Sequence, residues 1–331
     1  GVAAAERRRG RPRSLRRLVG HLRRILADPA AGETARADAA VALRRLADAE
    51  VAGADPVEWW GLIDPSTTEP LFAESESVAL SPSKLDSIKK SPLDWFLDWI
   101  APEESNSSMA IGSIVHAAME TATDPSVDAV WAAIEARWSE LVFESAWLAD
   151  QQRRIARRYA VGVAAYLQDA ASAGRTLVAA ERRFEVEVDR ARLRGTVDRI
   201  ERGDDGAVRI IDLKTGRPVT DAQAAENAQL GAYQLAYADG AFDELLEALG
   251  PHHAEGAQLL FVREGVRGKP YREASQPALD EAGLEAFRAR LRQAVAAIAV
   301  AELTGSRTVG RYDYGALRHR IHRVPPVTGE S

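Results

Sequence analysis

An aspartate and a lysine stand two residues apart inside the apolar run VRIIDLKTG, residues 208–216. Successive side chains of a β-strand point to opposite faces, so Asp212 and Lys214 would share one face. A carboxylate can hold a divalent cation, and a neighbouring ammonium can orient a water molecule or offset negative charge on a phosphate. The pair therefore indicates either hydrolytic chemistry on a phosphate or a plain ion pair at the end of a strand.

A second aspartate, Asp198, lies on the preceding strand-like run, LRGTVDRIE. The turn sequence RGDDG separates the two runs and predicts an antiparallel hairpin. A turn centred on Asp205 gives paired residues an index sum of 410 and sets Asp198 opposite Asp212, whereas a four-residue loop gives 409 and sends them to opposite faces. Directly opposed carboxylates, with Cβ atoms about 4.5–5.5 Å apart, repel unless a cation lies between them. A metal site therefore requires an odd loop or a bulge within residues 201–207.

Two helix-like stretches carry further polar side chains. His116 and Glu120 are four residues apart in IGSIVHAAME and would face the same side of a helix. A neutral imidazole can bind a metal, although a single histidine on an alanine-rich helix is more often structural. Gln229 and Tyr233 have the same spacing in QLGAYQLAY, where they either orient a site or form the polar edge of an amphipathic helix.

The elements that must position these residues follow one another in a mixed order. Apolar periodicity predicts helices over residues 15–26, 37–51, 113–123, 127–172, 221–240 and 277–303. Strand-like patterns mark residues 177–188, 191–201, 207–214, 257–264 and 268–275. This order predicts an α/β fold with a mixed sheet core flanked by helices. We expect a helical lead-in over residues 1–70 and the core domain over residues 71–331.

The composition narrows the chemistry. The chain of 331 residues has no cysteine, which excludes disulfides, thiolate zinc sites and iron–sulfur clusters. A metal must then be held by Asp, Glu, His or carbonyl groups, which favours Mg²⁺ or Mn²⁺. We find no signal peptide and no apolar run near the roughly 18 residues of a membrane span, and expect a cytoplasmic protein. Residues 1–24 hold nine arginines against one acid, as in a solvated linker or a nucleic-acid contact.

In their order along the chain, the four motifs resemble one known family. A helix with G-x-x-x-H, a strand with G-x-x-D, a strand with D-x-K-T-G and a helix with Q-x-x-x-Y are similar to those of RecB-type nucleases of the PD-(D/E)xK superfamily. The resemblance covers about three quarters of the chain, from about Ser81 to the tail. It implies a restriction-endonuclease-like fold that hydrolyses DNA phosphodiester bonds with Mg²⁺ or Mn²⁺.

The resemblance also implies a role for each matching residue. It assigns metal binding to three side chains and one carbonyl group: those of His116, Asp198, Asp212 and Leu213. Lys214 would be the catalytic lysine and would act with the two aspartates. Gln229 and Tyr233 would orient the substrate or the site. Glu181 stands where relatives often carry a glutamate, and Glu120, one turn after the histidine, is a further candidate.

This chain departs from many relatives, which stabilise the fold with an iron–sulfur cluster held by four cysteines. Ser91 stands before Pro92 where the first cysteine would be expected, and Tyr312, Gly315 and Ile321 stand at the matching positions of the tail. We therefore expect a form without a cluster, in which apolar contacts replace it.

The lead-in EWWGLIDP, the stretch LSPSKLD and an arginine- and alanine-rich composition with five lysines resemble helicase–nuclease subunits of actinobacterial type. The resemblance implies that the chain is the C-terminal part of a longer protein that carries a helicase motor. It also implies a second helicase–nuclease subunit, DNA with single-stranded ends as substrate, and a role in double-strand break resection and recombinational repair. Two alternatives stay open: a non-cleaving module that binds DNA or a partner subunit, and a free-standing nuclease.

Overall fold

The computed structural model describes residues 14–28, 30–59, 67–102, 107–122 and 124–305. The chain separates into two units, residues 1–68 and 69–331. Several positions for which the sequence raised expectations lie outside the described residues: residues 1–12, Trp60, Tyr312, Gly315 and Ile321. Among the described helices, none is both long enough and apolar enough to cross a membrane.

The first unit is built on two helices, α2 (Leu15–Ala27) and α3 (Glu33–Asp48), followed by the 3-10 helix η2 (Pro56–Glu58). Its small core consists of Val19, Leu43 and Ala54. The indole N–H of Trp59 donates to the carbonyl of Gly53 over 2.7 Å, and the guanidinium of Arg23 lies 4.6 Å from the centre of the Trp59 ring.

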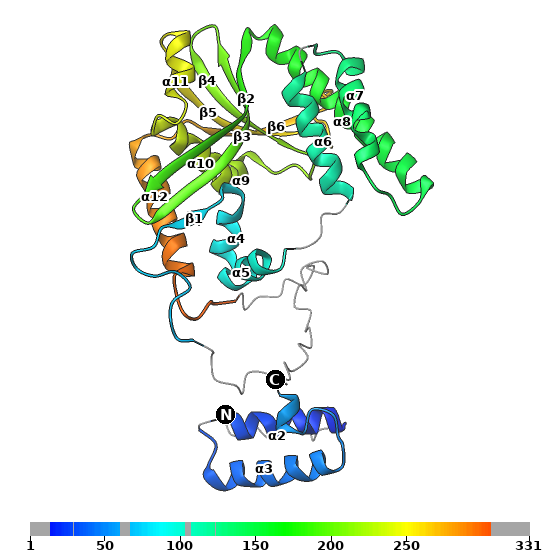
Figure 1. Ribbon diagram of the computed structural model, residues 1–331, viewed down its shortest axis with the longest axis vertical. Helices are drawn as coiled ribbons and strands as arrows, with labels where there is room; N and C mark the ends of the chain where they lie inside the picture. The colour runs from blue at the N-terminus through cyan, green and yellow to red at the C-terminus, as the bar shows by residue number, and fades with distance from the viewer. Residues whose placement is uncertain (1–13, 29, 60–66, 103–106, 123, 306–331) are drawn as a thin grey trace, which may run out of the picture. The chain divides into compact units, whose positions relative to one another are not determined.

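A six-stranded mixed sheet forms the middle of the second unit (Figure 1). Its strands are β1 (Val78–Leu80), β2 (Arg175–Val188), β3 (Ala191–Gly203), β4 (Ala207–Lys214), β5 (His253–Phe261) and β6 (Arg272–Pro277). The long hairpin β2–β3 is antiparallel, and the free edge of β3 is shared by β1 at its start and β4 at its end. Strands β4 and β5 are parallel, and β5 and β6 are antiparallel. The expected mixed sheet is confirmed.

Helices cover both faces of this sheet (Figure 1). The longer ones are α4 (Leu85–Lys90), α5 (Pro92–Ile100), α6 (Ser107–Thr121), α7 (Val127–Ala136), α8 (Ala146–Ser172), α10 (Ala228–Ala238) and α12 (Glu281–Ile298). Short helices are η3 (Pro82–Lys84), η4 (Trp138–Glu140), α9 (Asp221–Ala225), α11 (Asp243–Leu246) and η5 (Glu247–Leu249). Helices α6, α7 and α8 pack on one face, whereas α4, α10 and α12 pack on the other.

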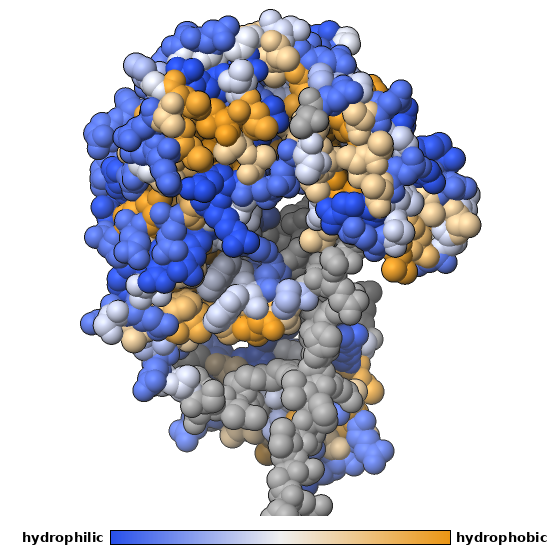
Figure 2. Space-filling view, turned by 45° about the horizontal axis from the view of Figure 1, so that its top comes forward, coloured by the Kyte–Doolittle hydropathy of each residue, from blue (hydrophilic) through white to orange (hydrophobic). Residues whose placement is uncertain are grey.

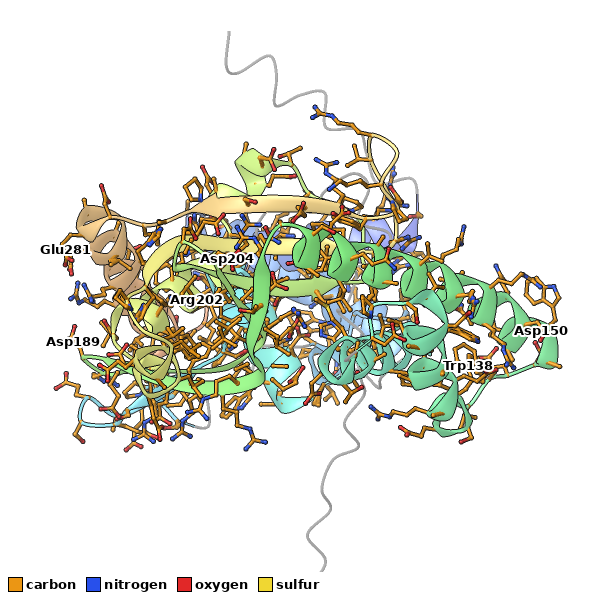
Figure 3. All side chains as sticks on the ribbon, turned by 90° about the horizontal axis from the view of Figure 1, so that it is seen from above. Trp138, Asp150, Asp189, Arg202, Asp204 and Glu281 are labelled. Atoms are coloured by element: carbon orange, nitrogen blue, oxygen red, sulfur yellow. The ribbon has the colours of Figure 1, made fainter. Side chains whose placement is uncertain are left out.

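An arm formed by α7 and the first part of α8 extends from one end of the sheet. Trp138 and Asp150 mark it in Figure 3, far from Asp189 and Glu281 at the opposite end. Apolar patches lie among hydrophilic residues on the surface of this arm in Figure 2. Inside it the ring of Trp138 stacks on that of Phe143 and meets that of Trp131 at a tilt. All three pack against the core beneath α6 and α8, which extends into the arm.

Strand β4 is buried on both faces. Its side chains point alternately to the two faces, and this alternation decides on which face each polar residue lies. Val208 and Ile210 belong to the core beneath α10 and α12, whereas Ile211 and Leu213 belong to the core beneath α6 and α8. Asp212 therefore follows Ile210 onto the α10 face, as the period of two requires.

Several helix boundaries differ from those expected. The helix predicted over residues 221–240 is two helices, because Asn227 accepts a hydrogen bond from the backbone N–H of Leu230 and starts α10 afresh. Helix α6 begins at Ser107, before Gly112. Pro92 separates α4 from α5: Ser91 caps α5 by accepting from the N–H of Asp94, and Pro92 occupies its first turn.

The β3–β4 hairpin has the register that the metal prediction requires. Four residue pairs, from Arg202↔Val208 to Arg199↔Ile211, share an index sum of 410. The connection has three residues, 204–206, so the loop is odd. The N–H of Gly206 donates to the carbonyl of Gly203 over 2.9 Å, and Gly206 has φ of +86°, which glycine adopts readily.

Gly206→Ala should destabilise the domain by about 1–3 kcal/mol, because the positive φ is strained in alanine. An added Cβ would also lie 2.7 Å from the carbonyl oxygen of Pro251. Urea unfolding would measure the change. Gly216→Ala is the matched control, since an added Cβ there meets open space, and its free energy of unfolding should move by less than about 1 kcal/mol. Equal effects of the two changes would show that the turn is not constrained.

Candidate metal centre and active site

The site lies where strand β4 leaves strand β3. The two strands pair no further than Arg199↔Ile211, while β4 continues to pair with β5 through Lys214. Just beyond this point the backbone N–H of Leu213 donates to Oδ2 of Asp198 over 2.7 Å. The Asp198 side chain thus takes the place of a ladder acceptor and satisfies a backbone donor that the separating strands leave open.

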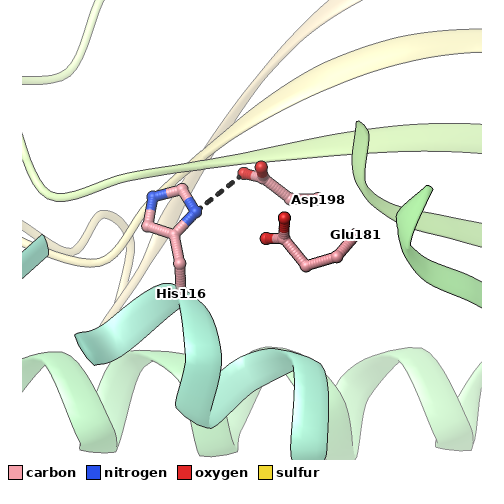
Figure 4. Close-up of side chains that lie close together, drawn as sticks. All are labelled: His116, Glu181 and Asp198. Carbon is pink, nitrogen blue, oxygen red and sulfur yellow. Dashed lines mark ion pairs between the residues drawn. The ribbon is translucent and has the colours of Figure 1, made fainter. Parts of the chain in front are cut away.

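Three side chains from three elements converge beside this fork (Figure 4). His116 comes from α6, Glu181 from β2 and Asp198 from β3. Each offers one ligand atom, and these atoms all lie within 4.8 Å of one another. Nδ1 of His116 is 3.1 Å from Oδ2 of Asp198. The side chain of Asp198 is 17% exposed and that of His116 is 28% exposed, so the cluster is partly shielded but open to solvent.

Glu181 owes its place to the register of β2 on β3. Ala180 pairs with Arg199 and Arg182 pairs with Val197, so Glu181 falls opposite Asp198. Its φ is +46°, a left-handed conformation that costs a non-glycine residue about 1–2 kcal/mol. Strain of this kind is found at functional sites when the surrounding structure holds the residue in place.

Asp212 is 1% exposed and is bound by donors from α10. Its Oδ1 accepts hydrogen bonds from the hydroxyl of Tyr233 over 2.8 Å and from Nε2 of Gln229 over 2.6 Å. Nε2 of Gln229 also contacts the Tyr233 hydroxyl over 2.6 Å, and its Oε1 accepts from Nζ of Lys214 over 2.9 Å. The amide of Gln229 therefore ties the acid, the phenol and the ammonium into one network.

The second oxygen of Asp212 has a different environment. Oδ2 lies 2.6 Å from Nζ of Lys214, but it is buried and accepts no well-aligned hydrogen bond from any group that the structure describes. A buried carboxylate oxygen without such a bond is costly unless a cation compensates it. Lys214 supplies part of that compensation, and its side chain is 34% exposed, so it reaches from the buried acid to the surface.

The crowding of acids changes the protonation of the site. Burial raises the pKa of Asp212, which the charge of Lys214 opposes and the charge of Asp198 reinforces. Burial also raises the pKa of Glu181, and so do Asp198 and Glu120. Burial alone would lower the pKa of the His116 imidazole, but the hydrogen bond and charge of Asp198 outweigh it and raise that pKa. All three shifts favour added positive charge in the site.

Most of the residues singled out from the sequence lie close together in the structure. Two of them, Asp212 and Leu213, are placed differently from what was expected. His116 and Asp198 meet as expected, but Glu181 completes their group in place of Asp212, which Gln229 and Tyr233 hold toward α10. Leu213 turns its N–H toward Asp198. Glu120 is exposed and acts on the group through its charge.

The donor set fits a hard divalent cation. Two carboxylates and an imidazole lie within reach of one ion, and Oδ2 of Asp212, which Lys214 compensates in part, is a further oxygen donor. Oxygen donors with one nitrogen suit Mg²⁺ or Mn²⁺, and the absence of cysteine excludes thiolate coordination.

A family model described as the PD-(D/E)XK nuclease superfamily matches residues 79–310. The chain belongs to this superfamily. The match takes in the whole sheet except the first residue of β1, and every residue of the candidate site. The fork at Asp198, the buried Asp212 and Lys214 are thus parts of a nuclease domain, which the superfamily equips for hydrolysis with divalent metals. No curated protein matches the chain.

Glu181→Gln should weaken Mn²⁺ binding by about 10–100-fold, because it removes a charged donor from the cluster. Calorimetric titration of the metal into the protein would measure this without any substrate. Glu187→Gln is the matched control: Glu187 lies on the same strand, is exposed, and pairs with Arg192 over 3.3 Å. Equal metal affinities of the two variants would contradict the place of Glu181 in the site.

Proposed function

We propose that this nuclease domain is a Mg²⁺- or Mn²⁺-dependent deoxyribonuclease and works as the nuclease module of a RecB-like helicase–nuclease. One observation supports the proposed deoxyribonuclease activity: a cluster of metal-ligand side chains and an acid–lysine pair lie next to each other. A cluster suited to a hard cation lies beside a buried Asp212–Lys214 pair whose ammonium reaches solvent. This combination suits the hydrolysis of a phosphodiester bond.

His116, Glu181 and Asp198 would hold the metal, with Oδ2 of Asp212 as a further donor. The bound cation would supply Lewis acidity at a phosphate oxygen and lower the pKa of a bound water. The protein fixes the position of the metal ligand Asp198 before any metal binds. The backbone N–H of Leu213 and the ring of His116 both contact its carboxylate. Pre-formed groups of this kind need little rearrangement during the reaction.

Lys214 would orient the attacking water or offset the charge that develops on the phosphate. Its Nζ is fixed from two sides, by Oδ2 of Asp212 at 2.6 Å and by Oε1 of Gln229 at 2.9 Å. Tyr233 and Gln229 in turn fix Asp212. The two α10 residues therefore act on the chemistry through the position of the acid and the lysine.

The cellular setting rests on the order of the motifs. The RecB-type sequence of G-x-x-x-H, G-x-x-D, D-x-K-T-G and Q-x-x-x-Y supports a nuclease joined to a helicase motor in the same polypeptide. In that setting the motor would deliver single-stranded DNA ends to this domain in the cytoplasm, together with a second helicase–nuclease subunit, during the resection of double-strand breaks.

Lys214→Ala should lower kcat for cleavage of single-stranded DNA with Mn²⁺ by about 100-fold or more, since it removes charge stabilisation in the transition state. Lys84→Ala, which loses an exposed lysine near Asp98, should cleave like the wild type. A chelator should abolish cleavage by every variant. A wild-type protein that binds the oligonucleotide but never cuts it with Mn²⁺ would make the domain a binding module.

The need for DNA ends can be tested separately. An end-processing enzyme should degrade linear single-stranded DNA at least about tenfold faster than a closed circle of the same sequence. Equal rates on both would overturn the role at DNA ends and leave the nuclease activity itself in place.

A further inference from the structure

A hollow of about 440 Å³ lies next to the active site. Its walls come from the start of α6, the first half of α8 and the segments that follow β4 and β5. Met109, Ile155, Arg158, Tyr159, Thr215 and Arg263 are among the residues that line it. The parallel strands β4 and β5 both end here, and in α/β sheets ligands commonly bind at the carboxyl ends of parallel strands.

The hollow and the catalytic residues share two elements. Thr215 follows Lys214 directly, and its carbonyl accepts a hydrogen bond from the Tyr159 hydroxyl over 3.4 Å. Helix α6 runs from Met109 at the hollow to His116 in the metal cluster. Seven helical residues span roughly 10 Å, which is the rise of about three stacked nucleotides.

The hollow is positively charged. Arg158 and Arg263 line it, and none of the described residues that line it is acidic. Arg158 is exposed and has no carboxylate within ion-pair distance among the described residues, and Arg263 has only a loose contact of 3.9 Å with Glu264. Both charges act on the Tyr159 hydroxyl: burial raises the pKa of Tyr159, and the two guanidinium groups oppose that rise.

Two other arginines of the same helix, Arg153 and Arg157, are already neutralised. Arg153 pairs with Glu135, and Arg157 pairs with Asp128 over 3.0 Å. Both guanidinium groups also lie over the ring of Trp131. Arg158, which lines the hollow, has no such partner among the described residues, so its positive charge can bind an external anion. Met109, which is 60% exposed, and the half-buried Ile155 give the hollow apolar surface as well.

We propose that this hollow binds the DNA strand a few nucleotides from the bond that is cut. Arg158 and Arg263 bind backbone phosphates, and Met109 and Ile155 pack against a base. The inference rests on the proposed nuclease function. A single strand fits best, because its bases are free to pack on apolar side chains while its phosphates meet arginines.

Binding of a fluorescent single-stranded oligonucleotide in chelator, followed by anisotropy, tests the two arginines without cleavage. The double variant Arg158→Gln/Arg263→Gln should bind about tenfold more weakly at 0.1 M salt, on the order expected for two lost phosphate contacts. The slope of log K against log salt concentration should shrink in magnitude by about 1.4, because each contact with a single strand contributes about 0.7. The control is Arg153→Gln/Arg157→Gln, which changes two paired arginines of α8 and should leave the slope unchanged.

A second experiment blocks the hollow without changing its charge. The chain has no cysteine, so Gln152→Cys, on the wall of the hollow, provides a single thiol for a bulky maleimide. Labelling should reduce oligonucleotide affinity at least about tenfold. Glu247→Cys, on the exposed η5 helix, should show no loss when labelled.

The outcomes separate the two proposals. The proposal that the hollow binds DNA is overturned if the arginine variant and the labelled Gln152→Cys protein both bind the oligonucleotide as the wild type does. This holds even if the enzyme cleaves DNA. Loss of binding to inorganic phosphate alone, with normal oligonucleotide binding, also overturns it. Loss of oligonucleotide binding in both variants supports the hollow, and a wild-type protein that then fails to cut DNA with Mn²⁺ overturns only the nuclease activity.

Discussion

The site depends on one electrostatic constraint: two strand registers set the carboxylates of Glu181 and Asp198 side by side and place a third, that of Asp212, on the adjoining strand. The β2–β3 register sets Glu181 opposite Asp198, and the β3–β4 register leads Asp198 to Asp212. Like charges near one another repel, and the charge of Asp198 raises the pKa of both Glu181 and Asp212. The folded chain offsets the repulsion with donors that surround the acids, among them the N–H of Leu213 and the ammonium of Lys214. The donors offset only part of the negative charge of the carboxylates, and the remaining negative charge attracts a cation.

The hydrophobic core holds these registers against that repulsion. Strand β4 buries apolar side chains on both of its faces, so a slip of one residue would send Ile210 to the wrong layer and Asp212 into the core beneath α8. Each fully buried isoleucine or leucine stabilises the fold by about 1.5–3 kcal/mol. Several such residues together outweigh the cost of about 1–2 kcal/mol for the left-handed backbone of Glu181. The packing of the sheet thus allows an arrangement that its polar residues alone would oppose.

Period and turn chemistry predicted every strand except β1, and they limited the β3–β4 hairpin to two loop lengths, of which the structure has the odd one. The meeting of His116 with Asp198 was expected from the resemblance to RecB-type nucleases, and these patterns alone did not predict it. They were insufficient for Glu181. Its side depends on an irregularity between Leu177 and Ala179 and on a positive φ, which no local motif announces. The separation of Asp212 from the cluster was equally hidden. It follows from where α10 places its two donors, and α10 begins at a cap within what reads as one continuous helix.

The distribution of charge explains why the arginines must lie beside the site and not within it. The chain carries a net charge of −6, so it gains no general attraction for a polyanion, and the acids of the centre repel phosphate in the absence of metal. Positive side chains inside the cluster would compete with the cation for the same oxygens. Arginines that line the hollow, roughly 10 Å along α6 from His116, attract the strand without occupying those ligands. Helix α6 keeps the two functions apart, since its start faces the hollow and its middle carries His116.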